Sequence, residues 1–280
     1  SRVPVDQYGT VRTDKLERMI TDETILISIA AASNEVGTIQ PIKEISELAT
    51  KNDIVFHTDA VAVEPTFPID VQEIPVDLMT LSSNDIYGPR GVGALYLKRG
   101  MRVNPLLIGG GQERGLRSGS HNMTGIVGFG KAAEIMNSEI QEEAKTIEKL
   151  RDELIEGILN EIPKSHLNGH PERRVPHNAN LRFDYIEGES LILGLKGENI
   201  AAATGSACSS KTLEPSHTLI AMGLLHEEAH VSLLLTLGRF SQEEDVKRIL
   251  DELPGIVKRL RLMSPLTPPD LIKHYQGVNE

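Results

Sequence analysis

The feature that most constrains the fold is an alternation of strand and helix patterns in the first part of the chain. Residues 24–32 form a nearly continuous apolar and β-branched run, which predicts a buried strand. Pro41 begins a segment whose apolar residues recur on one helical face, and residues 54–57 form a second short apolar run. Further strands are predicted at 78–82 and 94–97. A strand–helix–strand rhythm of this kind favours an α/β fold with a mainly parallel sheet.

The second half of the chain predicts a different arrangement. Residues 122–159 are rich in Glu and Lys and form one long helical pattern, which we expect to cross between two domains. Beyond it, short strand patterns (178–183, 200–203 and 231–237) alternate with helix patterns (190–196 and 242–260), which predicts a compact α+β domain. We therefore expect a large domain at 1–135, a smaller α+β domain at 136–264 and a terminal tail at 265–280.

Composition and charge exclude several classes of function. A single Cys rules out an internal disulfide framework, which fits a reducing compartment, and we expect the cytoplasm. A net charge of -11 disfavours nucleic acid as a partner, because phosphate binding needs clustered Lys and Arg. The longest apolar run, residues 25–32, is too short to span a bilayer. Residues 1–5 resemble the approach to a strand, so we expect an N-terminal portion of the protein to precede them.

The only thiol lies in a run of small, hydroxyl-bearing residues at 204–211, the thiol stretch. Cys208 has Gly205, Ser209 and Ser210 as neighbours, whereas an inert buried Cys usually has bulky apolar ones. Such a loop lets a thiolate act as a nucleophile or a metal ligand, and Lys211 nearby favours the anion. The alternative, a Cys that merely fills space, is left open by this stretch alone.

Polar residues follow three of the predicted strands, at the sheet edge where ligands collect in α/β folds. They are Ser33-Asn34-Glu35, Asp59-Ala60 and Ser82-Ser83-Asn84-Asp85. Asp59 either caps the next turn or holds a pyridine nitrogen protonated, as a carboxylate does in pyridoxal phosphate enzymes. The run Ser118-Gly119-Ser120 suits phosphate capture, although any helix N-terminus has a similar composition.

Residues 226–230 read His-Glu-Glu-Ala-His and match the H-E-x-x-H pattern of zinc peptidases. In those enzymes both His side chains bind zinc from one helix, and the Glu activates water. Here a strand pattern starts at Val231, and no third ligand stands at a recognised spacing. A zinc peptidase that uses His226, Glu227 and His230 is therefore an alternative that the following strand disfavours.

Nearly the whole chain resembles a known family, and six stretches carry the resemblance. They are Ser33 to Gly37, His57 to Ala60, Ile86 to Tyr96, Gly109 to Ser120, Tyr185 to Ser190 and Thr204 to Ser216. Together they resemble the cysteine desulfurases, the pyridoxal-phosphate-dependent family that supplies sulfur for iron–sulfur cluster assembly. The resemblance implies an aspartate-aminotransferase-like fold (fold type I), a homodimer, and pyridoxal phosphate in the large domain.

The same resemblance implies roles for five residues. Cys208 would accept sulfur from L-cysteine as a persulfide. Asn34 and Asp59 would contact the cofactor, whereas Ser82 and Ser120 would lie near its phosphate, with Ser120 reaching the site of the partner subunit. The family's first segment, which carries a phosphate loop and a His that stacks on the ring, has no counterpart in this chain.

Four positions depart from the family pattern. Where the family reads Ser-Gly-His-Lys, this chain reads Ser82-Ser83-Asn84-Asp85, so Asn84 replaces the His and Asp85 replaces the Schiff-base lysine. A carboxylate cannot condense with an aldehyde or act as the amine that moves a substrate proton. Ala62 replaces a Gln that hydrogen-bonds to the ring, and Leu234 replaces the Arg that binds the substrate carboxylate.

The departures spare the thiol stretch, which indicates impaired or absent cofactor chemistry beside a retained role for Cys208 in cluster assembly. Cys208 would carry a persulfide, or ligate a transient 2Fe–2S cluster shared with an iron–sulfur scaffold protein, with sulfur coming from L-cysteine or sulfide. The alternative is an active cysteine desulfurase that converts L-cysteine to L-alanine with noncovalently held pyridoxal phosphate. Neither nucleic acid nor a membrane is an expected partner.

Overall fold

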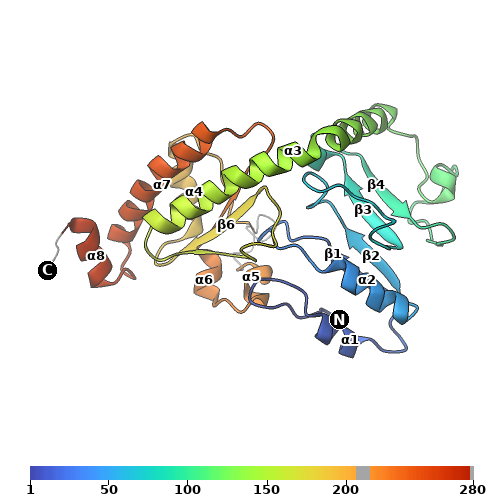
Figure 1. Ribbon diagram of the computed structural model, residues 1–280, viewed down its shortest axis with the longest axis horizontal. Helices are drawn as coiled ribbons and strands as arrows, with labels where there is room; N and C mark the ends of the chain where they lie inside the picture. The colour runs from blue at the N-terminus through green and yellow to red at the C-terminus, as the bar shows by residue number, and fades with distance from the viewer. Residues whose placement is uncertain (206–214, 278–280) are drawn as a thin grey trace. The chain divides into compact units, whose positions relative to one another are not determined.

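The computed structural model describes residues 1–205 and 215–277 (Figure 1). They form two compact units, and the chain passes between these units more than once. Unit 1 contains residues 1–16, 32–39 and the chain from 143 onward, whereas unit 2 contains residues 17–31 and 40–142. The units therefore divide after residue 142, and unit 1 takes in two N-terminal segments. The expected domain boundary after residue 135 stays a prediction.

Unit 2 is built on a four-stranded sheet with the strand order β1-β2-β3-β4. The strands are β1 (Leu26–Ala30), β2 (Val55–Asp59), β3 (Leu78–Ser82) and β4 (Gly93–Leu97). The first three run parallel, whereas β4 is antiparallel to β3. The α/β prediction with a mainly parallel sheet is confirmed, and the carboxyl ends of β2 and β3 carry Asp59 and Ser82.

α1 (Thr13–Met19) precedes β1, and the division between the units falls within it, after residue 16. In unit 2, α2 (Ile42–Lys51) connects β1 to β2 and packs beside β2 (Figure 1). The apolar face of α2 buries Ile42, Ile45 and Ala49, as the helical spacing of these residues predicts. Two 3-10 turns follow, η1 (Asn84–Ile86) after β3 and η2 (Glu113–Gly115) after β4.

The longest element is α3 (Met123–Glu161), which has 39 residues and confirms the predicted long helix. Its first part belongs to unit 2, where Ala132, Met136 and Ile140 pack with Ile86 of η1 in one buried cluster. Its last part belongs to unit 1. The packing in unit 2 fixes η1, the turn that contains Asp85.

Unit 1 contains a three-stranded antiparallel sheet, β5 (Ser165–Leu167), β6 (Asn178–Phe183) and β7 (Ser232–Thr236), with β6 in the centre. Its core combines apolar residues of β6 and β7 with the last part of α3, α4 (Gly188–Gly197) and α7 (Glu243–Met263) (Figure 1). The predicted strand at 200–203 is wrong, because only Ala203 pairs there, in an isolated bridge to Leu234.

Three further helices belong to unit 1: α5 (His217–Ala221), α6 (His226–His230) and α8 (Pro269–Gln276). The stretch that the sequence indicated as a tail thus contains a helix. Buried Arg261 of α7 connects to it, because its guanidinium donates to the carbonyls of Pro163, Lys164 and Asp184 and to the Tyr275 hydroxyl. No helix in the described part of the chain is long and apolar enough to cross a membrane.

Candidate functional site

Asp59 is the last residue of β2, at the carboxyl end of the parallel strands. Its Oδ1 atom accepts a hydrogen bond from the backbone N–H of Val61 at 3.0 Å. Its backbone carbonyl accepts one from the N–H of Ala31 at 2.8 Å. The carboxylate therefore caps a turn, one of the two roles that the sequence left open, and its side chain stays half-buried at the sheet edge.

Glu64 is a site residue that no sequence pattern indicates. Its side chain is buried, and both carboxylate oxygens accept from the backbone N–H of Ser82, at 2.9 and 3.2 Å. Burial raises the pKa of Glu64 to about 8; the Ser82 N–H opposes the rise, and the negative charges of Asp85 and Asp59 add to it. Glu64, Asp59 and Asp85 thus form a carboxyl cluster in unit 2.

The altered family positions in unit 2 differ in exposure. Asp85 is half-buried within η1, and its charge acts on Glu64. Asn84 is exposed, and its Oδ1 accepts from Nε of Arg90 at 3.1 Å. Ala62 is buried and carries no hydrogen-bonding side chain. The structure therefore places Asp59, Ser82 and Asp85 in one region, around Glu64.

Ser120 lies in the exposed segment between η2 and α3. Gly119 before it has a φ of +118°, and its N–H donates to Oε1 of Gln112 at 3.0 Å. The segment is thus held by a side chain of its own loop. The role of Ser120 near a phosphate stays a prediction.

Asn34 belongs to unit 1, in an exposed position within the turn at residues 33–37, where the chain leaves β1. Asn178 Nδ2 donates to the carbonyls of Asn34 at 3.1 Å and of Glu35 at 3.2 Å. Asn180 Nδ2 donates to the Glu35 carbonyl at 2.8 Å. The 33–37 turn is therefore fixed to β6 through its backbone, which leaves the Asn34 side chain out of these bonds.

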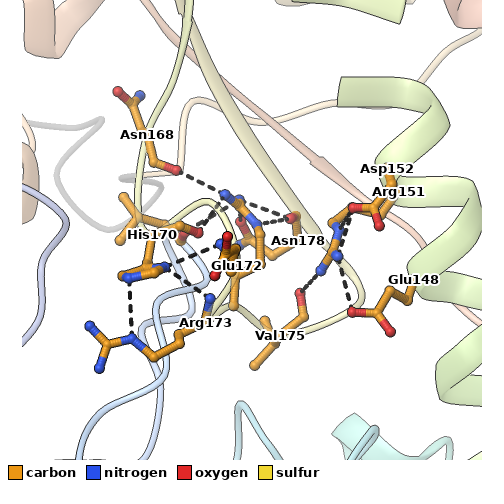
Figure 2. Close-up of polar contacts among 11 residues, drawn as sticks. Glu148, Arg151, Asp152, Asn168, His170, Glu172, Arg173, Val175 and Asn178 are labelled. Atoms are coloured by element: carbon orange, nitrogen blue, oxygen red, sulfur yellow. Dashed lines mark hydrogen bonds and ion pairs between the residues drawn. The ribbon is translucent and has the colours of Figure 1, made fainter. Parts of the chain in front are cut away.

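A buried guanidinium supports the same turn, within the polar network that Figure 2 shows. Arg174 donates at 3.0 to 3.4 Å to four backbone carbonyls, those of Val36, Asn168, His170 and Asn178. Burial, together with the nearby charge of Arg151, lowers the pKa of Arg174 to about 10. Because its donors bind carbonyls, Arg174 acts as a structural clamp on the 33–37 turn.

Cys208 lies outside the described residues, so its surroundings stay a prediction. Before it, the carbonyl of Thr204 accepts from the Ser232 hydroxyl at 2.8 Å. After it, buried Ser216 caps α5 by accepting a backbone N–H at 3.1 Å. Both flanks of the thiol stretch are therefore anchored within unit 1.

Leu234 lies on β7, where it pairs with Asn180 of β6 and exchanges backbone hydrogen bonds with Ala203. Its half-buried side chain offers neither a charge nor a hydrogen bond. The position that the resemblance assigns to a substrate-binding Arg is thus apolar in this chain.

The H-E-x-x-H match forms α6, which ends at His230 just before β7 begins. A helix of five residues stops where a zinc-peptidase helix would continue. Within the described ranges, no group of three or more His, Cys, Asp or Glu is placed to hold a metal ion. The geometry of α6 therefore disfavours the zinc-peptidase alternative.

The mainly parallel sheet with polar strand ends, followed by α3 and an antiparallel α+β unit, is the architecture of fold type I. Residues 1–249 match the aminotransferase class-V family, and the chain belongs to that family. Within it, the similar proteins are cysteine desulfurases, as the resemblance predicted.

The chain is 57% identical over 264 residues to cysteine desulfurase IscS 1 of Archaeoglobus fulgidus, which covers 94% of this chain and 69% of the relative. It is 56% identical over 268 residues to cysteine desulfurase IscS of Methanosarcina thermophila, covering 96% and 66%. A solved NifS-like protein has a TM-score of 0.85 at 36% identity, covering 93% of this chain and 68% of that one. The chain thus spans about two thirds of the length of these proteins.

The residues of unit 2 fit pyridoxal phosphate, the cofactor expected for this family, only in part. Asp59 offers a carboxylate at a strand end, the kind of group that would keep a pyridine nitrogen protonated. Asp85, however, supplies a carboxyl group at the position that the resemblance assigns to the lysine, and the backbone N–H of Ser82 is already bonded to Glu64. This set of groups does not fit covalently held pyridoxal phosphate.

Proposed function

We propose that this chain is a cysteine desulfurase-like protein of iron–sulfur cluster assembly, located in the cytoplasm, whose lysine-dependent desulfuration is impaired or absent. Cys208 is the working residue, as a persulfide carrier or as a ligand of a transient 2Fe–2S cluster. The carboxyl cluster carries this proposal, because Asp59, Glu64 and Asp85 gather acids where an enzyme of this family needs an amine.

The carboxyl cluster opposes the family chemistry in two ways. Asp85 cannot condense with an aldehyde, so no covalent bond to the cofactor can form at the position where the family has its lysine. Additional negative charge beside Asp59 and Asp85 is unfavourable in a partly buried site, which weakens the binding of a phosphate. In unit 1, Leu234 offers no partner for a substrate carboxylate, whereas an Arg would bind it through two charge-assisted hydrogen bonds.

Sulfur transfer to Cys208 needs no cofactor when the donor is itself a persulfide. The Cys208 thiolate attacks the terminal sulfur of the donor, a new S–S bond forms, and the donor leaves as a thiolate with no net oxidation. In the ligand role, the thiol loses its proton and the thiolate binds iron. Either role requires a second protein that receives the sulfur or shares the cluster.

A groove beside the thiol stretch supports a scaffold protein as that partner. The groove, of about 1100 Å³ and within unit 1, is lined by Thr204 and Ser216, which stand on either side of the undescribed residues. Exposed Leu225, Met263 and Leu266 contribute apolar surface to it. A partner seated there would face both flanks of the segment that carries Cys208.

A homodimer is also part of the proposal. Unit 2 exposes several large apolar side chains close together in the sequence, which a second subunit would cover. They include Leu106, which is 93% exposed, Ile108, which is 88% exposed, Met123 and Val127. Ser120 lies in the same exposed stretch, consistent with its predicted role in the partner subunit's site.

The loss of desulfuration is tested by supplying L-cysteine and free pyridoxal phosphate to the purified chain and measuring alanine and sulfide. We expect alanine and sulfide to form only at the rate that free pyridoxal phosphate gives without the protein. Turnover at the rate of an intact desulfurase assayed in parallel would refute this half of the proposal, whatever Cys208 does.

The role of Cys208 is tested by reconstitution with iron and sulfide beside a purified scaffold protein. The wild-type chain and Cys208→Ser are compared by cluster yield and by absorption and Mössbauer spectra. We expect a lower yield and an altered spectrum for Cys208→Ser. The same yield and spectrum for both would contradict the ligand role, and persulfide detection by mass spectrometry then tests the carrier role separately.

Asp59 favours the second candidate, an active desulfurase with noncovalent pyridoxal phosphate, since contacts to the ring do not require the lysine. This candidate predicts a yellow colour that survives gel filtration in the wild type and vanishes in Asp59→Ala. It also predicts alanine formation above that of the free cofactor. A colourless wild-type protein after gel filtration would exclude it.

A further inference from the structure

The imidazole ring of His170 caps the turn that follows it in unit 1 (Figure 2). Its Nδ1 atom accepts hydrogen bonds from the backbone N–H groups of Glu172 at 3.1 Å and Arg173 at 2.9 Å. Its Nε2 atom lies 3.1 Å from Nε of Arg173. The groups that face the two ring nitrogens in these contacts are therefore all N–H donors, and two of them belong to the backbone of the turn.

The capped turn is joined by its backbone to the segment that contains the 33–37 turn. The carbonyl of Arg173 accepts from the N–H of Ile39 at 3.0 Å, and the N–H of Val175 donates to the carbonyl of Gly37 at 2.8 Å. These two bonds form a junction between residues 170–175 and residues 36–39. The conformation that the ring imposes on its own turn therefore also fixes this junction.

His170 contacts the same segment directly. Its backbone N–H donates to the Thr38 hydroxyl oxygen at 2.9 Å, and that hydroxyl donates to the carbonyl of Tyr8 at 2.6 Å. The ring of Tyr8 lies against the imidazole, with 5.2 Å between the ring centroids. The half-buried imidazole is thus enclosed between Tyr8 and the turn that it caps.

The surroundings of the ring oppose its protonation. Burial lowers the pKa of His170 from its ordinary value of 6.5, and the positive charges of Arg173 and Arg174 lower it further. The negative charges of Glu172 and Asp6 act in the opposite direction without reversing this effect. The closed turn therefore favours the neutral imidazole.

We propose that His170 is a pH-sensitive latch, in that its neutral ring keeps the junction closed and protonation of the ring opens it. An imidazolium carries a proton on each nitrogen, so contacts between donors would replace the two bonds that Nδ1 accepts. When the turn moves away from the ring, water can solvate the charge. The 33–37 turn, which carries Asn34, then loses part of its support. The latch uses no residue of the thiol stretch, so it fails or holds independently of the proposed function.

The size of the effect is limited by the ordinary pKa of the side chain. In the open turn the ring returns to a pKa of 6.5 and binds a proton that the closed turn excludes. The closed junction is therefore favoured fully above pH 6.5, and this preference is lost as the pH falls below that value. At pH 5.5, one unit lower, the open state gains at most about tenfold in population.

The test is hydrogen exchange of the backbone amides of the full chain at pH 5.5 and 7.5, corrected for the intrinsic pH dependence of exchange. The amides of Ile39 and Val175 report on the junction, and the amide of Phe183 on β6 reports on the rest of unit 1. In the variant His170→Asn, the new Oδ1 can accept the same backbone N–H groups but cannot be protonated. His226→Asn, which changes an exposed His of unit 1, is the matched control.

In the wild type and in His226→Asn, we expect the protection of Ile39 and Val175 to fall about three- to tenfold at pH 5.5, whereas that of Phe183 stays constant. His170→Asn should show no such fall. The proposal is overturned if the wild type shows no fall, if His170→Asn shows the same fall, or if Phe183 falls equally.

A second measurement decides if circular dichroism shows that His170→Asn does not fold. The His170 ring is then titrated in the wild type by NMR. A midpoint below 6.5, together with the wild-type loss of protection, supports the latch, whereas a midpoint at or above 6.5 overturns it.

Discussion

Replacing Glu64 by Gln should remove a pH-dependent loss of stability from unit 2. The pKa of Glu64 rises from 4.5 to about 8 in the folded protein, chiefly because the carboxyl group is buried. Between these values the folded chain keeps a proton that the unfolded chain has released. The stabilising contribution of Glu64 is therefore fully present below pH 4.5 and is lost as the pH rises to about 8.

The magnitude follows from the size of the shift. At 1.36 kcal/mol per pKa unit, the full interval corresponds to roughly 4 to 5 kcal/mol of unfolding free energy. The amide introduced by Glu64→Gln cannot ionise, yet its carbonyl oxygen can still accept from the N–H of Ser82. We expect the two proteins to have similar stability at pH 5 and Glu64→Gln to be more stable by up to that amount at pH 8.5.

The assay is urea unfolding at pH 5, 6, 7 and 8.5, followed by circular dichroism. Glu73→Gln, which changes an exposed carboxylate of the same unit, controls for the loss of a surface charge. If the unfolding free energies of the wild type and Glu64→Gln differ by the same amount at all four pH values, the pKa of Glu64 lies in the ordinary range. The argument from burial would then be wrong.

Three further outcomes are expected. The Asp85→Lys variant should form little more alanine from L-cysteine and pyridoxal phosphate than the wild type does. Adding Leu234→Arg to it should raise alanine formation about ten- to a hundredfold. A double variant that forms no more alanine than the single variant would contradict this expectation. Arg174→Met should lower the unfolding free energy by about 2 to 4 kcal/mol in urea, because it strands buried carbonyls, whereas exposed Arg173→Met should change it by less than about 0.5 kcal/mol. Gly169→Ala should cost about 2 kcal/mol or more in the same assay, since at a φ of +85° its Cβ would clash with the backbone carbonyl oxygen of Val36.

Much of the fold could be predicted because the buried strands are short apolar runs with clear limits. β3 and β6 lie at the predicted bounds, 78–82 and 178–183. The prediction failed where contacts with distant parts of the chain decide whether a segment forms a strand or a helix. Residues 200–203 look like a strand but pair only at Ala203, and the prolines before α8 hid a helix that begins at Pro269, where a proline ring is tolerated.

The candidate site was predictable where a residue follows a strand, as Asp59 does. Glu64 was not, because nothing in its local sequence shows that it lies against Ser82, which is 18 residues away. The burial of Arg174 could not be predicted from its local sequence either. Its neighbours Glu172 and Arg173 are exposed, so the charged run looks like a solvated surface, and only the folded unit shows that Arg174 is buried.

The clamp on the 33–37 turn has a consequence for how the protein is made. The bond from Arg174 joins Val36 across 138 positions, and the bond from Asn180 joins Glu35 across 145. A ribosome that adds about 5 to 20 residues per second needs roughly 7 to 30 s to deliver those partners. During that interval the turn that carries Asn34 has its own local hydrogen bonds but lacks Arg174 and Asn180. A pause in translation anywhere between these positions would prolong its exposure to chaperones and proteases.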